Sequence, residues 1–316
     1  MTNLILTRKN FADFLDPSTG KPIPMEGDVV IPEVVVDRDG NEYNIIEIGD
    51  DAFAGCENLT SITIPDSVTE IGEYAFCYCK SLTTITIPDS VTKIGEWVFQ
   101  DCENLTSITI PDSVTEIGDS AFFGCKSLTT ITIPDSVTEI EDWTFQDCKN
   151  LASITIPDSV TKIDVGSFYG CKNLTSITIP DSVTEIGNAA FTNCSDDFVI
   201  TYRGYDYTLG NLYMLSKQSD GLDILACMNI MSDAADILGD NSYSPVLMSK
   251  LINAEHNGSL EKTYEKIKQD FQTIGFYEIS SKVDVEAKDR LTTLFKENTT
   301  TRGVVPKIID ALTIAS

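Results

Sequence analysis

The chain has few of the side chains that enzymes and nucleic-acid-binding proteins rely on. It contains a single histidine, His256, in 316 residues, and general base catalysis most often uses a histidine beside a nucleophile and an orienting acid. His256 lies in a polar Glu-His-Asn-Gly segment, where a solvated residue at a helix end is the simpler interpretation. The 22 basic residues face 49 acidic ones, a formal net charge of −27. Because phosphate binding needs clustered basic side chains, this charge argues against nucleic acid as a partner.

Long hydrophobic runs and catalytic motifs are missing as well. Threonine, serine and proline break every apolar stretch before it approaches the roughly 20 residues of a membrane helix, so no membrane insertion is expected. The first residues place a short apolar patch ahead of Arg8, Lys9 and Asp13, the reverse of a signal peptide. No P-loop, GxGxxG, HExxH or GxSxG motif occurs in the sequence. The sequence therefore predicts a non-enzymatic protein with no catalytic residues, no cofactor and no metal.

What the chain has in abundance is a repeat of 23 residues. Proline ends one segment of the repeat, and phenylalanine and cysteine recur in another. These residues are Pro65, Pro88, Pro111, Pro134, Pro157 and Pro180; Phe53, Phe76, Phe99, Phe122, Phe145, Phe168 and Phe191; and Cys56, Cys79, Cys102, Cys125, Cys148, Cys171 and Cys194. A fixed period of this length is the signature of a stacked solenoid, in which the repeated surface is the first candidate for function.

Each repeat reads as one turn, or rung, of such a solenoid. The stretch LTSITI alternates and is β-branched, which predicts a strand with Ile62 and Ile64 on one side and the hydroxyls on the other. Pro65 ends the strand because it has no N–H to donate. Val68 and Ile71 then return to the apolar side, so each rung adds to a continuous core.

The repeat resembles the BspA type of leucine-rich repeat (the treponemal class), whose consensus is close to LxxIxIPxxVxxIGxxAFxxC. The resemblance covers about residues 45–194. It implies a right-handed curved solenoid with a parallel sheet on its concave face and little helix. It also implies a bacterial or protist surface or secreted protein with a role in adhesion. Since no signal peptide is visible, a cytoplasmic location stays open beside the cell surface.

Four regions are expected along the chain. Residues 1–44 form an N-terminal cap, residues 45–195 the repeats, residues 196–208 a β-hairpin cap around Gly204, and residues 209–316 a helical C-terminal domain of no recognised family. The helical prediction rests on apolar residues at helical spacing. One such set is Leu260, Tyr264, Ile267, Phe271 and Ile274.

Two features of the repeat affect the core. The seven repeat cysteines would stack about 5 Å apart, and an odd number at equivalent positions favours small apolar core residues over disulfides or a metal site. The glycine at 72, 95, 118 and 187 is replaced by Glu141 and Asp164 in two rungs. We therefore expect that this position does not need a positive φ, or that those two rungs are locally bent.

Two hydroxyl columns on the predicted concave face are candidate ligand-binding residues. Stacked hydroxyls can donate to and accept from a glycan or an extended peptide. The alternative is that threonine merely favours strands and keeps the face soluble. The columns comprise Ser61, Thr84, Ser107, Thr130, Ser153 and Ser176, and Thr63, Thr86, Thr109, Thr132, Thr155 and Thr178.

An acidic column follows the prolines. Like charges about 5 Å apart cost energy unless something compensates them. A bound cation such as calcium is one solution, and backbone N–H groups of the turn are the favoured one. The column consists of Asp66, Asp89, Asp112, Asp135, Asp158 and Asp181.

Three aromatic residues share one repeat position. Other rungs place Ser120, Gly166 and Ala189 where these place Tyr74, Trp97 and Trp143. Core positions do not tolerate such exchanges, so the rings are expected outside, as anchors for a ligand. Packing on neighbouring rungs is the alternative.

The sequence as a whole predicts a monomeric interaction protein that binds a protein or a glycan through its repeats. A second hypothesis makes the repeats a scaffold for an effector-like or enzymatic activity in residues 209–316. A third makes the solenoid a structural spacer without a discrete partner.

Overall fold

The computed structural model describes residues 2–18, 20–195 and 197–208, together with five residues between 224 and 232. The chain divides into two compact units, residues 1–198 and 199–316. The predicted helical domain and His256 lie outside the described residues, except for those five, which are in helical conformation. The described residues contain no helix long and apolar enough to cross a membrane.

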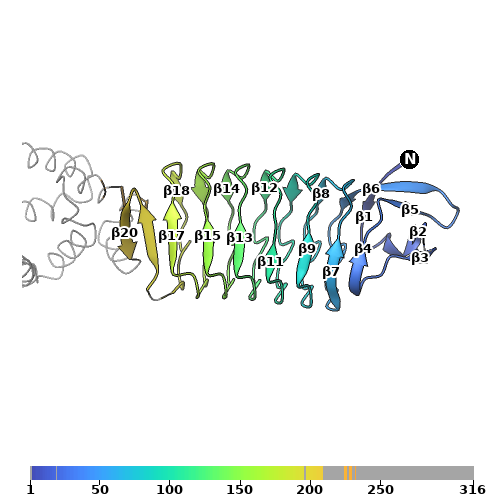
Figure 1. Ribbon diagram of the computed structural model, residues 1–316, viewed down its shortest axis with the longest axis horizontal. Helices are drawn as coiled ribbons and strands as arrows, with labels where there is room; N and C mark the ends of the chain where they lie inside the picture. The colour runs from blue at the N-terminus through green and yellow to red at the C-terminus, as the bar shows by residue number, and fades with distance from the viewer. Residues whose placement is uncertain are drawn as a thin grey trace, which may run out of the picture. The chain divides into compact units, whose positions relative to one another are not determined.

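The first unit is a stack of rungs built on two parallel ladders of strands (Figure 1). The first ladder begins with β4 (Gly27–Val30) and continues with the strands predicted from LTSITI and its equivalents, which point their isoleucines inward: β7 (Leu59–Thr63), β9 (Thr84–Thr86), β11 (Ser107–Ile108), β13 (Thr130–Thr132), β15 (Ser153–Thr155) and β17 (Ser176–Ile179). Its register places equivalent residues of successive repeats side by side, so that Ser61 pairs with Thr84 and Thr63 with Thr86.

The second ladder was not predicted from the sequence. Apart from its first strand, its strands are only two residues long: β6 (Glu42–Ile48), β8 (Glu70–Ile71), β10 (Lys93–Ile94), β12 (Glu116–Ile117), β14 (Glu139–Ile140), β16 (Lys162–Ile163) and β18 (Glu185–Ile186). It pairs in the same parallel register, as with Glu70 opposite Lys93. Its hydrogen-bonded path runs from β6 to β12 and resumes from β14 to β18.

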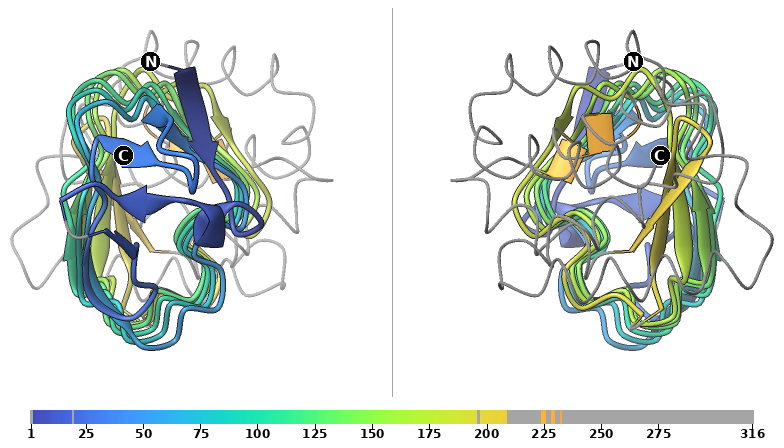
Figure 2. Two further views of the ribbon diagram at one scale, coloured as in Figure 1. Left: turned by 90° about the vertical axis from the view of Figure 1, so that its right-hand side faces the viewer. Right: turned by 90° about the vertical axis from the view of Figure 1, so that its left-hand side faces the viewer.

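The phenylalanine column forms the centre of the core. Seen along the stack, the rungs superpose closely (Figure 2). Adjacent rings from Phe53 to Phe191 stack with centroids 5.3–5.7 Å apart. All seven rings are fully buried. The core is therefore continuous from rung to rung, as the period of 23 residues predicts.

The cysteines are core residues, as predicted. Those of the repeat up to Cys171 are buried and Cys194 is half-buried, and all the cysteines described by the structure are free. From Cys79 onward, each repeat thiol donates a hydrogen bond of 3.1–3.3 Å to the carbonyl of the phenylalanine 26 residues before it. Burial raises the pKa of Cys79 to about 12. These thiols are consequently structural and unreactive.

The repeated glycine is needed because rungs approach closely. A Cβ at Gly118 would lie 2.7 Å from the backbone nitrogen of Glu96, and one at Gly187 would lie 2.4 Å from that of Val165. None of the four glycines has a positive φ, which confirms that the position does not require one. Where Glu141 replaces the glycine, the second ladder is interrupted just before it, between β12 and β14. At Asp164, the other replacement, the pairing is kept, since β14 pairs with β16 and the backbone N–H of Asp164 donates to the carbonyl of Ile140 at 2.8 Å.

The N-terminal segment adds the first strands of both ladders. These are β4 in the first ladder and β6 in the second. The remaining elements are β1 (Thr2–Leu6), which pairs parallel with β6, a short 3-10 helix (Phe11–Asp13), β2 (Leu15–Asp16), β3 (Lys21–Pro22) and β5 (Val34–Val36), which pairs antiparallel with β6. The ring of Phe11 meets Phe53 edge-on with centroids 4.9 Å apart, so an aromatic side chain covers the first ring of the column.

The described start of the second unit is an antiparallel hairpin. β19 (Val199–Tyr202) pairs with β20 (Tyr205–Thr208), and Gly204 in the turn has a φ of 77°. A left-handed turn residue of this kind is what glycine supplies at low cost. The hairpin around Gly204 is therefore present as the sequence predicts.

Candidate interaction surfaces

The two predicted hydroxyl columns lie together on the first ladder. We call the twelve residues from Ser61 to Thr178 the hydroxyl face: Ser61, Thr63, Thr84, Thr86, Ser107, Thr109, Thr130, Thr132, Ser153, Thr155, Ser176 and Thr178. Their side chains are exposed, except that Ser61 is half-buried. The hydroxyls of Ser61 and Thr60 donate to the carboxylate of Asp28, at 2.7 and 2.8 Å, and these bonds lower the pKa of Asp28.

Other hydroxyls of the repeat are occupied by bonds between rungs. Ser90, for example, donates to the carbonyl of Val68 at 2.6 Å, and Thr92 donates to that of Thr69 at 3.3 Å. Both bonds recur along the stack. On the hydroxyl face, by contrast, no hydroxyl after Ser61 has a hydrogen-bond partner within the described part of the chain. The face therefore presents free donors and acceptors to solvent.

The acidic column after the prolines does not have the bonds expected of it. Its six residues, from Asp66 to Asp181, are exposed, and none accepts a hydrogen bond from any residue that the structure describes. The prediction that turn N–H groups satisfy these carboxylates is wrong. From Ser90 onward, the serine next to each aspartate donates its hydroxyl to a valine carbonyl of the preceding rung, whereas Ser67 has no such partner among the described residues. The carboxylates are left in water, where the repulsion between them is screened.

The shared aromatic position has a left-handed backbone. Tyr74, Trp97, Ser120, Trp143 and Ala189 have φ between 55° and 59°, and Gly166 has 62°. Tyr74 and Trp97 stack with centroids 6.2 Å apart and planes at 4°. Trp143 covers the next rung, since a Cβ at Gly166 would lie 2.1 Å from its ring.

The rings are therefore less exposed than the sequence suggests. Tyr74 is 37% exposed, whereas Trp97 and Trp143 are half-buried, and Ser120 is fully buried. Packing on neighbouring rungs, the alternative considered for these residues, is what the structure shows. A role as ligand anchors stays a prediction, and it rests most directly on Tyr74.

The left-handed position gives a test of backbone strain. We expect Ala189→Gly to raise the free energy of unfolding by about 1 kcal/mol, because a left-handed φ costs a residue with a Cβ about 1–2 kcal/mol relative to glycine. Ala189→Val should lower it, since branching at Cβ worsens the same clash. Urea denaturation of the three proteins measures both changes. Equal stability of the glycine and valine variants would contradict the argument.

A third surface, which the sequence did not reveal, is an acidic groove along the second ladder. Its volume is 340 Å³. Glycines 72, 95 and 118 lie among eight carboxylate residues and one lysine; the groove is lined by Glu47, Asp50, Glu70, Gly72, Glu73, Lys93, Gly95, Glu96, Glu116, Gly118, Asp119 and Glu141. Burial, reinforced by neighbouring carboxylates, raises the pKa of Glu47, Glu96, Asp119 and Glu141.

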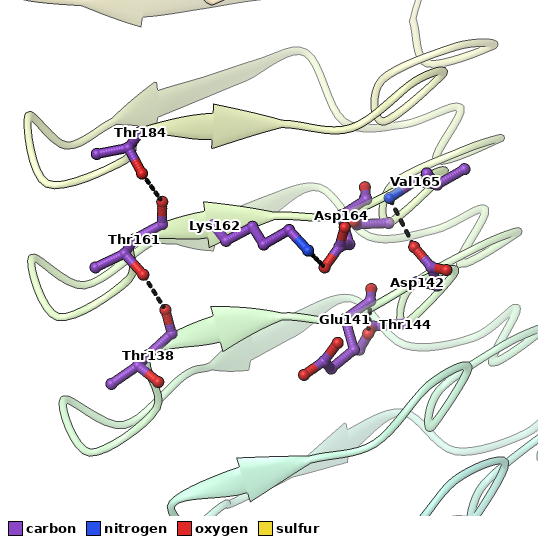
Figure 3. A network of polar contacts seen from close by, with 10 residues as sticks. Thr138, Glu141, Asp142, Thr144, Thr161, Lys162, Asp164, Val165 and Thr184 are labelled. Carbon is purple, nitrogen blue, oxygen red and sulfur yellow. Dashed lines mark hydrogen bonds and ion pairs between the residues drawn. The ribbon is translucent and has the colours of Figure 1, made fainter.

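Beyond Glu141 lies the part of the ladder drawn in Figure 3. There Lys162 forms an ion pair of 2.8 Å with Asp164, which is 9% exposed, and the carboxylate of Asp142 accepts the backbone N–H of Val165 at 2.9 Å. Glu139, Glu141 and Asp164 each offer an oxygen within 4.8 Å of the others. Lys162 already supplies a positive charge to this cluster.

Comparison with known proteins agrees with the repeat and the ladders. The BspA type leucine-rich repeat region matches in six copies, over residues 41–152 and 98–202. The chain belongs to the BspA-type leucine-rich repeat family. A comparison with curated protein sequences gives no match.

Two solved structures of bacterial leucine-rich repeat proteins resemble the chain. A leucine-rich cell surface protein from Faecalibacterium prausnitzii is 39% identical, with a TM-score of 0.50 over 60% of this chain and 52% of its own. The Treponema pallidum leucine-rich repeat protein is 33% identical, with a TM-score of 0.51 over 58% of this chain and 87% of its own. The BspA-type chain thus spans about half the length of the first relative. The family is typical of surface and binding proteins.

Proposed function

We propose that this BspA-type chain is a non-enzymatic binding protein of the cell surface or of secretions, with an adhesive role, and that the hydroxyl face takes a glycan or an extended peptide. The observation that supports the proposal most is the contrast between hydroxyl columns. Two columns elsewhere in the repeat, which include Ser90 and Thr92, donate hydroxyls to carbonyls of the preceding rung, whereas the hydroxyls of the hydroxyl face after Ser61 are free and exposed. A regular array of free hydroxyls can replace, at many points, the hydrogen bonds that a polar ligand makes with water.

Family and surface charge support the same function. The F. prausnitzii relative is described as a cell surface protein, and repeat proteins commonly bind through an extended repeated surface. A partner that binds the hydroxyl face must tolerate the chain's net charge of −27, which favours neutral or cationic ligands. Of the three predicted aromatic anchors, Tyr74 is the most exposed.

The experiment uses two variants matched by rung, residue type and charge. Thr86→Lys/Thr109→Lys alters the hydroxyl face, and Thr92→Lys/Thr115→Lys alters exposed threonines of the same two rungs on another surface. The full chain is screened against immobilised glycans and extracellular-matrix proteins. We expect the first variant to lose binding by about ten-fold or more and the second to keep it.

Two results would overturn the proposal. Equal binding by the wild-type chain and the Thr86→Lys/Thr109→Lys variant would remove the hydroxyl face as the site. Absence of any ligand in the screen would favour the spacer hypothesis. Trp97→Ser/Trp143→Ser, with its fold checked by circular dichroism, separately tests the aromatic anchors.

A further inference from the structure

The acidic groove on the second ladder is a surface that the proposed function does not use. We propose that it binds an extended segment of a partner polypeptide that carries several lysine or arginine residues. The groove and the hydroxyl face lie on different ladders, so this inference does not depend on the proposed function. It rests on the shape of the groove, on its unbalanced charge, and on two groups that show how a cation is held there.

The shape follows from the repeat. Glycine lines the groove at three successive rungs; acidic residues flank Gly72 and Gly118 on both sides in the sequence, whereas Gly95 has Lys93 on one side and Glu96 on the other. One side has Glu70 and Glu116, and the other has Glu73, Glu96 and Asp119. At Glu141 a side chain replaces the glycine and limits the open channel. The result is a lengthwise channel with carboxylates repeating at the spacing of the rungs, about 4.8 Å.

The charge of the groove is largely uncompensated. Among the ion pairs of the described residues, only the one between Lys93 and Glu116, at 3.1 Å, involves a lining carboxylate. The remaining seven lining carboxylates form no ion pair in that part of the chain. Neighbouring carboxylates contribute to the raised pKa of Glu47, Glu96 and Asp119. Because these charges repel one another, a bound cationic segment would relieve a repulsion that the free protein carries.

Lys93 shows how an ammonium group is held in this channel. Its hydrogen bond with Glu116 raises its pKa, and the charges of Glu70 and Glu73 add to the effect. The repeat supplies glutamate, not lysine, at the equivalent positions 70 and 116. Lysines of a bound partner would supply positive charge at the rungs of Glu70 and Glu116, as Lys93 does at the rung between them.

An exposed aromatic ring lies close to the same carboxylates. Tyr74 is 37% exposed on a ring stack with Trp97. The backbone N–H of Tyr74 donates to the carbonyl of Glu96 at 2.9 Å, and burial together with the charges of Glu73 and Glu96 raises the pKa of Tyr74. A ring face beside carboxylates attracts ammonium and guanidinium groups by cation–π and ionic interactions together. The ring therefore adds an aromatic contact to the carboxylates and points to the same class of ligand.

A polypeptide suits the groove better than a metal ion. Metal binding needs several oxygens converging on one point. Among the described residues, three such oxygens converge only at Glu139, Glu141 and Asp164, where Lys162 already neutralises Asp164. Elsewhere the carboxylates are distributed along the channel, which matches charges distributed along an extended chain.

The test measures binding of a labelled peptide by fluorescence anisotropy. The probe is a peptide of about ten residues that alternates lysine and glycine, with a glutamine-for-lysine peptide as the uncharged control. The groove variant is Glu73→Gln/Glu96→Gln/Asp119→Asn. The matched control is Asp112→Asn/Asp135→Asn/Asp158→Asn, which removes the same charge from the exposed acidic column. Both variants use the full chain.

We expect the groove variant to weaken binding of the lysine peptide by about ten-fold or more, and the control variant to weaken it by less than about three-fold. Equal weakening by both variants would show attraction to net charge alone and would overturn the inference. So would an absence of binding by the wild-type chain at about 50 mM salt, or complete displacement of the peptide by about 1 mM calcium, which would instead indicate a cation site.

Discussion

Replacing Phe122 with alanine is expected to lower the free energy of unfolding by about 3–5 kcal/mol. Phe122 is fully buried, and its ring stacks on Phe99 at 5.3 Å and on Phe145 at 5.5 Å. The substitution removes contacts on both faces of the ring and leaves a cavity in the middle of the column. Because each rung contacts only its neighbours, no distant part of the core can fill it. Urea denaturation followed by circular dichroism measures the loss.

The neighbouring residue provides the control. Phe123 is half-buried and contacts Trp97 with centroids 5.8 Å apart. Phe123→Ala removes the same atoms, but from a ring that water already reaches, so we expect a loss of less than about half that of Phe122→Ala. Similar losses for the two variants would mean that the phenylalanine column is not the main source of stability.

The period of 23 residues was enough to predict the first ladder and the core columns. A strand such as Leu59–Thr63 can be recognised in the sequence because polar and apolar residues alternate in its segment. The buried isoleucines, phenylalanines and cysteines follow once every rung is assumed equivalent. The second ladder could not be predicted in this way, because two residues such as Glu70–Ile71 are too few to show an alternation. Its strands exist because rung stacking brings their backbones together.

Side-chain roles were harder to infer than backbone positions. The sequence gives serine and threonine in several columns. Only the structure distinguishes Ser90, whose hydroxyl donates to the carbonyl of Val68, from Thr86, whose hydroxyl has no hydrogen-bond partner among the described residues. The aromatic position was misjudged for a related reason. Its tolerance of tryptophan, serine and glycine reflects a left-handed backbone with rings lying over the next rung, at Gly166 for instance, and not full exposure.

The acidic lining of the groove could have been predicted from the sequence, but only by comparing residues that become neighbours when successive rungs stack. Glu70, Lys93 and Glu116 are 23 residues apart, so a column-by-column comparison would have shown the accumulation of charge. What it could not show is how closely the glycine between the acidic positions approaches the rung before it, since a Cβ at Gly118 would lie 2.7 Å from the backbone nitrogen of Glu96.

The groove also predicts an unusual dependence of stability on pH. Burial and neighbouring carboxylates raise the pKa of Glu47, Glu96, Asp119 and Glu141 in the folded chain. The folded state therefore binds more protons than the unfolded state between the raised values and the unfolded values near 4, and stability falls as pH rises through this window. We expect the melting temperature to rise as pH falls from about 7 to about 5. Differential scanning calorimetry at constant ionic strength measures it.

Carboxylates whose pKa is lowered in the folded chain limit this rise in melting temperature at lower pH. Hydrogen bonds lower the pKa of Asp28, Asp37 and Glu103, so the stability they contribute is lost only as pH falls below about 4. Glu96→Gln/Asp119→Asn should raise the melting temperature at pH 7 and flatten the profile between pH 5 and 7, because both substitutions remove a charge that neighbouring carboxylates repel in the folded chain. Asp112→Asn/Asp135→Asn, on the exposed column, should leave the slope unchanged. A melting temperature that falls steadily from pH 7 to pH 5 would contradict the assignment of the groove as a site of stored repulsion.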